Sequence, residues 1–285
     1  MTISDILYHH IYPPVNGLIC CIRDSSITVC NPATRQIVKL PDLTCNGRYI
    51  HARLGYDPVE DQYKVLCLLT TTNLFRPNQN NIQEEYLVCT VTSSKKQEWR
   101  KIENTVGLCL GISRGICIDG AIYYETGKLM IVRFDVRTEN IKLIRASEES
   151  DFLRKFPSTL LNYNGKLGIV DYPYKSVKRL WILEDAEKQQ WSSMTCVLPL
   201  ELECLLGSYV VSKRDVHNGE IMVFHPWSWS LEKFCRVYYY DFKKESIIRK
   251  VEVVVDGEFR RILGIGEQKC LILCYPGYFE NIRFL

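Results

Sequence analysis

The sequence has no apolar run of the roughly 18–20 residues that a membrane-spanning helix requires. Its first residues, MTISDILYHHIYPP, contain neither the basic stretch nor the apolar core of a secretory signal. The chain also lacks a large excess of charge of either sign, because 36 basic and 33 acidic residues leave a net charge of only +3. We therefore expect no membrane and no nucleic-acid partner, and a location in the cytoplasm and/or nucleus.

Catalytic and metal-binding motifs are scarce as well. None of the five histidines has a cysteine or a carboxylate pair at the spacing of a metal site. Residues 111–115, GISRG, match the spacing of a serine nucleophile elbow, but a strand-like run follows where that motif requires a helix. The acidic pairs Glu84-Glu85 and Glu148-Glu149 are interpreted as solvated loop charges. We expect no catalytic residue, no metal, no cofactor and no enzymatic activity.

A disulfide framework is not indicated, although the chain has 13 cysteines. Their number is odd, and they are scattered through apolar strand-like runs. Cys20 and Cys21 are adjacent, and Cys270 and Cys274 are four apart, so neither pair has the C-x-x-C spacing that structural zinc prefers. We expect reduced cysteines that pack as small hydrophobic residues in a reducing compartment.

The clearest feature that is present is a hairpin over residues 53–69, RLGYDPVEDQYKVLCLL. Asp57-Pro58 favours a type I turn, because proline fixes φ and aspartate can accept a hydrogen bond from the following backbone. After the turn, Tyr63, Val65, Cys67 and Leu69 alternate with Lys64, Leu66 and Leu68. This pattern predicts two antiparallel strands.

The arrangement of strand, polar turn and strand recurs along the chain. Asp119-Gly120 and Asn164-Gly165 predict tight hairpins, since both dipeptides favour type I′ turns. One position repeats at irregular intervals that bracket the roughly 40–50 residues of a propeller blade. It is the first large apolar residue after the last turn of each unit: Ile37, Trp99, Ile141, Trp191 and Ile247.

These repeats predict an all-β fold, namely an irregular kelch-like β-propeller of about six four-stranded blades, with a large β-sandwich as the alternative. We expect an N-terminal segment over residues 1–15 and one domain over residues 16–285. The sixth unit, which starts near Arg261, is short. We therefore expect a strand within residues 6–12 to complete it.

Taken in order, several motifs resemble the associated domain of plant F-box proteins, most closely the kelch-like type. They are GLICC, CNPATRQIVKLP, LGYDPVEDQYKVLCLL, EEYLVCTV with EWRKI, RGICIDGAIYY, LMIVRFDVRTENIKLI, LLNYNGKLGIV, LWILEDAEKQQWS and YFENIRFL. The resemblance covers residues 16–285 and implies a substrate-recruiting domain of an SCF-type (Skp1, cullin, F-box) ubiquitin ligase. In that family an F-box precedes this domain, and residues 1–15 contain no LPxDL-like opening. We therefore expect an unknown protein substrate as partner, and a Skp1-like adaptor only if an F-box is supplied.

Binding residues are expected in loops that a rigid scaffold presents, and aromatic side chains are common anchors of interfaces. The candidates are Trp227, Trp229, Tyr172, Tyr174, Phe75 and Arg76. The competing interpretation is that these side chains pack against a blade, as we expect for Trp99, Trp181 and Trp191. Two other functions stay open: an autonomous binding protein without a ligase link, and a propeller hydrolase or sugar-binding protein.

Overall fold

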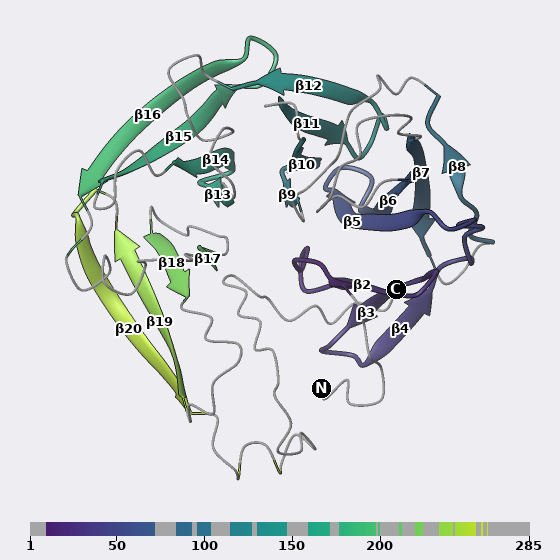
Figure 1. Cartoon of the computed structure of the whole chain (residues 1–285), viewed down its shortest axis with the longest axis horizontal. Coiled ribbons are helices and arrows are strands. Elements are labelled where there is room, and N and C mark those ends of the chain that lie inside the picture. Colours follow the sequence, from purple (N-terminus) through teal and green to yellow (C-terminus); the bar gives the residue numbers. More distant parts are fainter. Residues whose placement is uncertain are drawn as a thin grey trace. The chain divides into compact units, whose positions relative to one another are not determined.

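The computed structural model consists mainly of short antiparallel strands joined into five separate sheets (Figure 1). It describes residues 10–71, 84–92, 96–103, 115–126, 130–146, 159–171, 177–197, 199, 211–212, 220–224, 234–241, 243–254, 258 and 261. Within this part of the chain, no helix is long and apolar enough to cross a lipid bilayer.

Each sheet contains four strands, and its strands are neighbours in chain order. Sheet 1 contains β1 (His10–Ile11), β2 (Ile19–Arg23), β3 (Ser26–Asn31) and β4 (Gln36–Lys39). Sheet 2 contains β5 (Tyr49–Asp57), β6 (Gln62–Thr70), β7 (Glu84–Val91) and β8 (Arg100–Lys101). Sheet 3 contains β9 (Ile116–Ile118), β10 (Ala121–Glu125), β11 (Met130–Asp135) and β12 (Ile141–Arg145).

The remaining two sheets are built in the same way. Sheet 4 contains β13 (Thr159–Tyr163), β14 (Lys166–Asp171), β15 (Val177–Asp185) and β16 (Gln190–Val197). Sheet 5 contains β17 (Val211–Ser212), β18 (Glu220–Phe224), β19 (Phe234–Asp241) and β20 (Ser246–Val254). The unit predicted to begin near Arg261 lies beyond the residues that the structure describes in detail.

The predicted hairpin at residues 53–69 is confirmed by the pairing of β5 with β6, in which Tyr56 lies opposite Tyr63. The Asp57 carboxylate accepts a hydrogen bond from the Val59 N–H at 3.0 Å. Asp61, the last residue of the turn, has a φ of 52°. The turn is therefore held by a side-chain cap at its start and a left-handed residue at its end.

This capped turn recurs once in every sheet. An aspartate or asparagine ends one strand and accepts backbone N–H groups two or three residues later, and the fourth residue after it has positive φ. The capping residues are Asn31, Asp57, Asp135, Asp185 and Asp241. The left-handed residues are Arg35, Asp61, Glu139, Gln189 and Glu245. The repeat that the sequence showed is thus a repeat of local backbone chemistry.

The Asp-Gly and Asn-Gly hairpins are also confirmed. Asp119 and Gly120 connect β9 to β10 with φ values of 42° and 75°. Asn164 and Gly165 connect β13 to β14 with φ values of 50° and 83°. Positive φ at both central residues is the geometry of a type I′ turn, which matches the twist of the paired strands.

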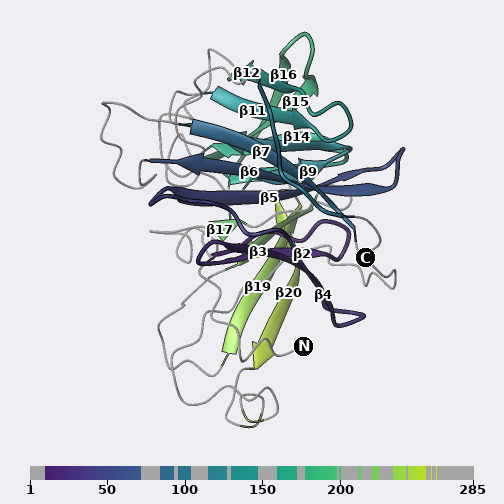
Figure 2. The same cartoon turned by 90° about the vertical axis from the view of Figure 1, so that its right-hand side faces the viewer.

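The chain divides into two compact units. The unit of residues 7–146 and 278–285 contains sheets 1 to 3, and the unit of residues 1–6 and 147–277 contains sheets 4 and 5. In the first unit, sheet 2 lies between sheets 1 and 3 (Figure 2). One face of sheet 2 packs on sheet 1 through residues such as Ala52, Val65 and Cys67, and the opposite face packs on sheet 3 through residues such as Leu66 and Val88.

The expectation that a strand within residues 6–12 completes the sixth unit was wrong for residues 10 and 11. His10 and Ile11 form β1, which pairs with Ile22 and Cys21 of β2 and so completes sheet 1. The Tyr12 N–H donates to the Cys20 carbonyl oxygen at 2.9 Å and continues this ladder. The apolar residues around Cys20 lie in β2 and need a partner strand on the side away from β3. The segment directly before β2 provides that strand.

Five cysteines in the described part of the chain are buried and reduced, as the sequence indicated, and Cys45 and Cys117 are partly buried. Cys20, Cys21, Cys30, Cys67 and Cys89 are buried with free thiols. Burial raises the pKa of the Cys89 thiol to about 11, because a thiolate would lose its hydration. Such thiols are unreactive packing groups.

Candidate interaction surface

The six side chains predicted to contact a partner lie outside the described residues, but the strands on either side of them are placed. Phe75 and Arg76 fall between β6 and β7, Tyr172 and Tyr174 between β14 and β15, and Trp227 and Trp229 between β18 and β19. All three segments thus connect the second and third strands of a sheet. In an antiparallel sheet this connection is at the end opposite to the first-to-second and third-to-fourth turns.

We call the two ends of each sheet the turn end and the connection end. The capped turns all lie at the turn end, because each joins the first strand to the second or the third to the fourth. At the connection end the chain runs through 71–83 in sheet 2, 172–176 in sheet 4 and 225–233 in sheet 5. Three aromatic segments far apart in the sequence therefore each join the second strand of a sheet to the third.

Buried polar groups also lie between sheets 2 and 3. Arg53 of β5 is 2% exposed, and its guanidinium lies 4.0 Å from the centre of the Tyr124 ring of β10. Burial raises the pKa of Tyr124 to about 12, although the Arg53 charge acts in the opposite direction. Burial likewise raises the pKa of Tyr86 on β7, and the Tyr124 hydroxyl beside it adds to the effect. This cluster is a permanent cation and two neutral phenols that join two sheets.

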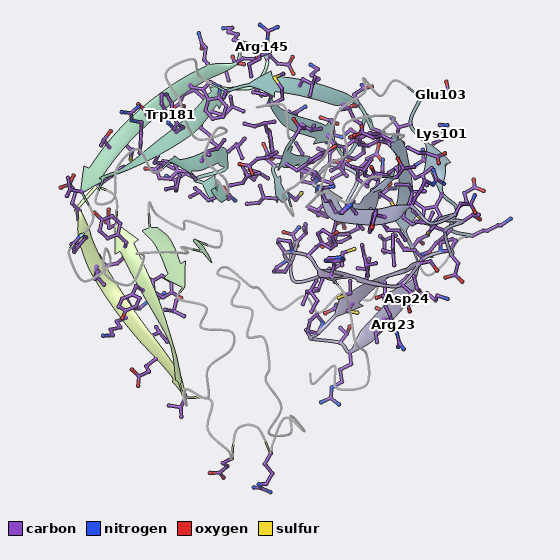
Figure 3. The ribbon with its side chains drawn as sticks, in the orientation of Figure 1. Arg23, Asp24, Lys101, Glu103, Arg145 and Trp181 are labelled. Carbon is purple, nitrogen blue, oxygen red and sulfur yellow. The ribbon has the colours of Figure 1, made fainter. Side chains whose placement is uncertain are left out.

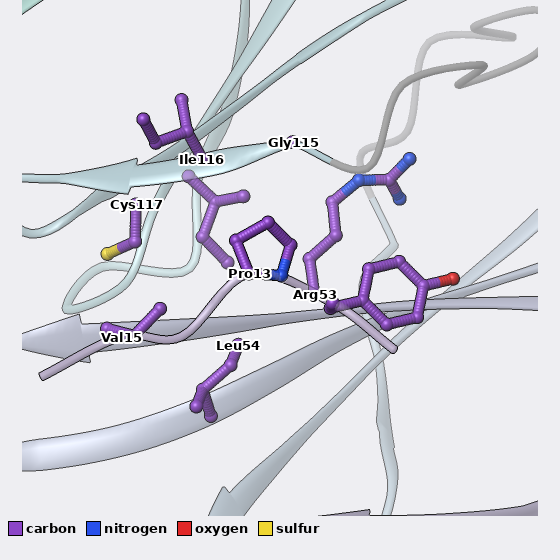
Figure 4. A pocket seen from close by; sticks show the side chains of 9 residues that line it. Pro13, Val15, Arg53, Leu54, Gly115, Ile116 and Cys117 are labelled. Atoms are coloured by element: carbon purple, nitrogen blue, oxygen red, sulfur yellow. The ribbon is translucent and has the colours of Figure 1, made fainter. Parts of the chain in front are cut away.

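A cavity beside Arg53 is too small for a ligand. Its volume is about 10 Å³, which is room for one water molecule. In Figure 4, Arg53 extends past Gly115, and Pro13, Leu54 and Ile116 complete the wall. The cavity is a packing gap between β5, β9 and the segment that precedes β2.

The GISRG segment has a structural explanation at its last residue. Gly115 has a φ of +70°, and a Cβ added to it would lie 2.8 Å from Cδ of Arg53. Ile116–Ile118 then forms β9, so a strand follows the serine as the sequence indicated. Residues 111–114 lie outside the described part. Gly115 meets a backbone and packing requirement, and the strand argues against a nucleophile elbow.

The histidines do not form a metal site within the described residues, where no group of three His, Cys, Asp or Glu side chains is placed to hold an ion. His51 on β5 is mostly buried, and burial together with the Arg53 charge lowers its pKa to about 3. It is therefore a neutral side chain at physiological pH. His10 lies on β1, and His9, His217 and His225 are outside the described part of the chain.

The interpretation of Glu84-Glu85 as solvated loop charges was wrong. Both residues lie in β7, and both are partly buried. The Glu85 carboxylate accepts a hydrogen bond from Arg48 at 2.6 Å and pairs with Lys101 at 3.5 Å. The Arg48 hydrogen bond lowers the pKa of Glu85, although burial opposes it. Sequence alone missed these partners because Arg48 precedes β5 and Lys101 belongs to β8. Glu148-Glu149 lies outside the described residues.

The tryptophans predicted to be core side chains differ in burial. Trp181 on β15 is buried (Figure 3), as expected. Trp99 is half-buried against the core of sheets 1 and 2, and its indole N–H donates to the Pro41 carbonyl oxygen at 2.8 Å. Trp191 on β16 is also only partly buried.

Charged residues join the turn ends of sheets 2 and 3. The guanidinium of Arg137 donates to both carboxylate oxygens of Asp57, with distances from 2.9 to 3.2 Å. Lys64, which is 5% exposed, donates to Glu139 at 2.9 Å, and Arg100 donates to the same carboxylate at 2.7 and 2.8 Å. The capped turns of two sheets are thereby held together.

A groove that the sequence did not indicate runs along β4. It is an open surface depression with a volume of about 590 Å³. It is lined by residues 36–42, Thr92 and Gln97. The side-chain amide of Gln97 donates to the Thr92 carbonyl oxygen, and Lys39 pairs with Asp42 at 3.0 Å. No local motif marks this groove, since it forms where sheet 1 meets the β7–β8 connection.

Comparison with known proteins gives the family. The model of the F-box associated beta propeller domain matches residues 1–272. The chain belongs to the F-box associated β-propeller family. This F-box-associated chain is 35% identical to F-box protein At1g30790 of Arabidopsis thaliana over 291 residues, which covers 95% of the chain and 71% of the relative.

Further relatives from the same plant carry similar names. Putative F-box protein At4g21240 is 33% identical, with 97% of this chain and 69% of the relative covered. F-box/kelch-repeat protein At3g04660 is 31% identical, with 78% of this chain and 59% of the relative covered. The F-box-associated chain therefore spans between 59% and 71% of the length of these relatives.

Solved structures match more weakly. A chain of the mitotic checkpoint complex has a TM-score of 0.45 at 12% identity and covers 88% of this chain and 66% of that chain. Oligogalacturonate lyase in complex with manganese has a TM-score of 0.46 at 10% identity and covers 84% and 62%. Neither similarity carries an argument about function. The propeller prediction is confirmed by the family and the five four-stranded sheets, and the sandwich alternative is set aside.

Proposed function

We propose that this F-box-associated domain is a non-enzymatic interaction module that captures a protein partner, and that it delivers the partner to ubiquitination when it is joined to an F-box. The observation that carries the proposal is its family membership over residues 1–272. The partner and the ligase then meet in the cytoplasm or nucleus. A Skp1-like adaptor binds through the F-box and not through this domain.

The order of the strands within each sheet supports the connection ends as capture sites, each considered in its own unit. Turn ends are fixed by capped turns and, between sheets 2 and 3, by the Asp57 and Glu139 ion pairs. In sheets 2, 4 and 5 the connection between the second and third strands contains the aromatic candidates, and it is longer than the capped turn of the same sheet. Because a fixed scaffold that presents variable segments is the common design of binding proteins, the aromatic segments are the proposed anchors.

Adaptor dependence is tested with the chain as it is and with a relative's F-box fused before Met1. We expect a purified Skp1-like adaptor to be retained by the fusion only. Retention by the chain without the fusion would contradict this part of the proposal, because it would require an adaptor-binding surface on the propeller itself.

Partner capture is tested by crosslinking the fusion in plant extract and comparing variants. Trp227→Ala with Trp229→Ala should remove the crosslinked partner. The control, Glu187→Ala with Lys188→Ala, alters the capped turn between β15 and β16 at a turn end, and it should leave capture unchanged. Equal capture by both variants would move the partner surface away from the β18–β19 connection.

A further inference from the structure

Sheet 1 has a second face, on the side away from sheet 2. Residues along a strand alternate between the two faces. Cys20 and Ile22 belong to the core of sheets 1 and 2, so Cys21 between them points the other way. Cys30 lies on the second face as well, because its partner on β2 is Ile19, two residues before Cys21. A hydrogen bond between the side chains of Cys21 and Cys30, which raises the pKa of the Cys21 thiol, confirms that they share this face.

The second face is covered by other parts of the chain. Cys21 and Cys30 are each 0% exposed, and a fully buried side chain is in contact with several others. Ile11 and Ile19, which lie beside them on this face, are half-buried. Sheets 2 and 3 do not provide the cover, because sheet 2 packs on the first face of sheet 1 and sheet 3 packs on the far side of sheet 2. The cover therefore lies outside the described strands of this unit.

The compact unit that contains sheets 1 to 3 also includes a segment from much later in the sequence. Residues 278–285 belong to it, although residues 147–277 belong to the other unit. The remaining stretches of this unit outside the described ranges precede β1 or connect strands of sheets 2 and 3: residues 7–9, 72–83, 93–95, 104–114 and 127–129. Residues 278–285 are thus the part of the unit that no direct connection ties to β1 or to sheets 2 and 3.

We propose that residues 278–285, YFENIRFL, pack across the second face of sheet 1 as a strap. Their side chains suit an apolar surface, since in an extended segment Ile282 and Phe284 point to the same side and can cover the two buried thiols. Burial of this apolar area away from water stabilises the contact. The strap is separate from partner capture, because it joins the first sheet of the chain to a segment that follows the second unit in sequence.

Thiol alkylation tests the strap, with N-ethylmaleimide as the probe and peptide mass mapping as the readout. Cys21 and Cys30 report on the second face. Cys20 and Cys67 are also fully buried but lie in the core of sheets 1 and 2, so they are the matched control thiols. All four should be protected in the unaltered chain. Deletion of residues 278–285 should raise the alkylation rates of Cys21 and Cys30 at least about tenfold, because an uncovered thiol is accessible and ionises more readily. The control thiols should stay protected.

Addition of the missing segment tests the same contact in the opposite direction. A synthetic peptide with the sequence of residues 278–285 should restore the protection of Cys21 and Cys30 in the deletion variant. A peptide of the same composition in scrambled order is the control and should leave both thiols reactive.

Photo-crosslinking in the full chain keeps the test independent of whether the deletion variant folds. Phe284 is replaced by p-benzoylphenylalanine, which retains the aromatic ring. Irradiation should then link residue 284 to residues 10–31 of sheet 1. The control has the same replacement at Tyr49, which is exposed and lies on the face of sheet 2 turned away from sheet 1, and it should give no link to the second face.

Unchanged protection of Cys21 and Cys30 after the deletion would overturn the inference, because another part of the chain would then cover the second face. Equal alkylation of all four thiols would show that the deletion variant is unfolded, and the crosslink then decides. Links from residue 284 to sheets 2 or 3, to residues 147–277 or to a second copy of the chain would also overturn it. None of these results bears on the proposed function, which is tested by adaptor binding and partner capture.

Discussion

At the scale of single residues, the least replaceable positions are those where a side chain from another sheet fills the available space. Gly115 illustrates this, because its backbone is left-handed and Arg53 occupies the position where a side chain would begin. Arg53 in turn stacks on Tyr124 of the next sheet. One glycine therefore affects the contact between sheets 2 and 3.

Gly115→Ala should lower the free energy of unfolding by about 2–3 kcal/mol, which combines left-handed strain with the displacement of Arg53. In thermal unfolding this is a fall of roughly 5–10 °C in Tm. The control is Gly47→Ala, whose φ is +77° but whose added Cβ meets nothing within 4 Å. Equal losses in the two variants would show that contact with Arg53 does not matter.

The ion pairs at Glu139 predict a pH dependence of stability. Burial raises the pKa of Glu139, but hydrogen bonds from Arg100 and Lys64 outweigh it and hold the pKa below its ordinary value. The unfolded chain therefore binds the proton more readily than the folded chain does. The stabilisation is present above the unfolded pKa of about 4.3 and is lost as pH falls through the folded pKa.

Glu139→Gln should lower the free energy of unfolding at neutral pH by about 1–2 kcal/mol and flatten its fall below about pH 4.3. Urea unfolding across a pH series measures both effects. Glu60→Gln changes an exposed carboxylate at the tip of a neighbouring turn and serves as the control. Parallel pH profiles for the unaltered chain and Glu139→Gln would be inconsistent with this assignment.

At the scale of elements, the capped turn is the unit that repeats. Its two requirements are local: an aspartate or asparagine that caps and a fourth loop residue that accepts positive φ. Glutamate, glutamine and arginine fill this last position in several copies, at a cost in strain that glycine would avoid.

Substitution of Glu245, the left-handed residue before β20, separates these requirements. Glu245→Val should lower Tm by roughly 3–8 °C, because a β-branched side chain is strained at a φ of 50°. Glu245→Gly should change Tm by about 2 °C or less, since relief of strain and loss of chain entropy offset each other. Differential scanning calorimetry measures both variants. A valine variant as stable as the glycine variant would contradict the positive φ.

Elements that depend on neighbours in sequence could be predicted, and those that depend on distant contacts could not. The hairpins at Asp57-Pro58, Asp119-Gly120 and Asn164-Gly165 are readable because turn chemistry is local. The partner of β1 is not, because strand pairing depends on which apolar edge lies nearby. The groove along β4 could not be predicted for the same reason, since Thr92 and Gln97, which also line it, are distant from β4 in the sequence.

At the scale of the whole chain, stability depends on sheets that pack face to face, since a single four-stranded sheet has two faces to cover. Within the unit of sheets 1 to 3, sheet 2 is covered on both faces. Sheet 1 depends on its first strand, because β1 and Tyr12 cover the edge of β2 that does not face β3. The Tyr12 hydroxyl oxygen also accepts a hydrogen bond from the Ala52 N–H of sheet 2 at 3.2 Å.

Deletion of residues 1–12 should therefore lower the free energy of unfolding by about 2–3 kcal/mol through lost burial of Tyr12 and the lost β1 ladder. The expected fall in Tm is roughly 5–10 °C. Tyr12→Phe keeps the ring and removes the acceptor for Ala52, so it should account for only part of this loss. A melting curve of the deletion variant that matches the full chain would show that β1 does not stabilise sheet 1.

The unequal ends of the sheets also affect how such a chain can diversify. Doubling the length of a connection costs only about 0.6 kcal/mol in closure entropy, so a gene copy can gain or exchange residues between β6 and β7 with little penalty. A capped turn has no such freedom, because one inserted residue moves the left-handed position away from the cap. The segment between β6 and β7 can therefore change in length and sequence while the capped turns keep the geometry of the sheets constant.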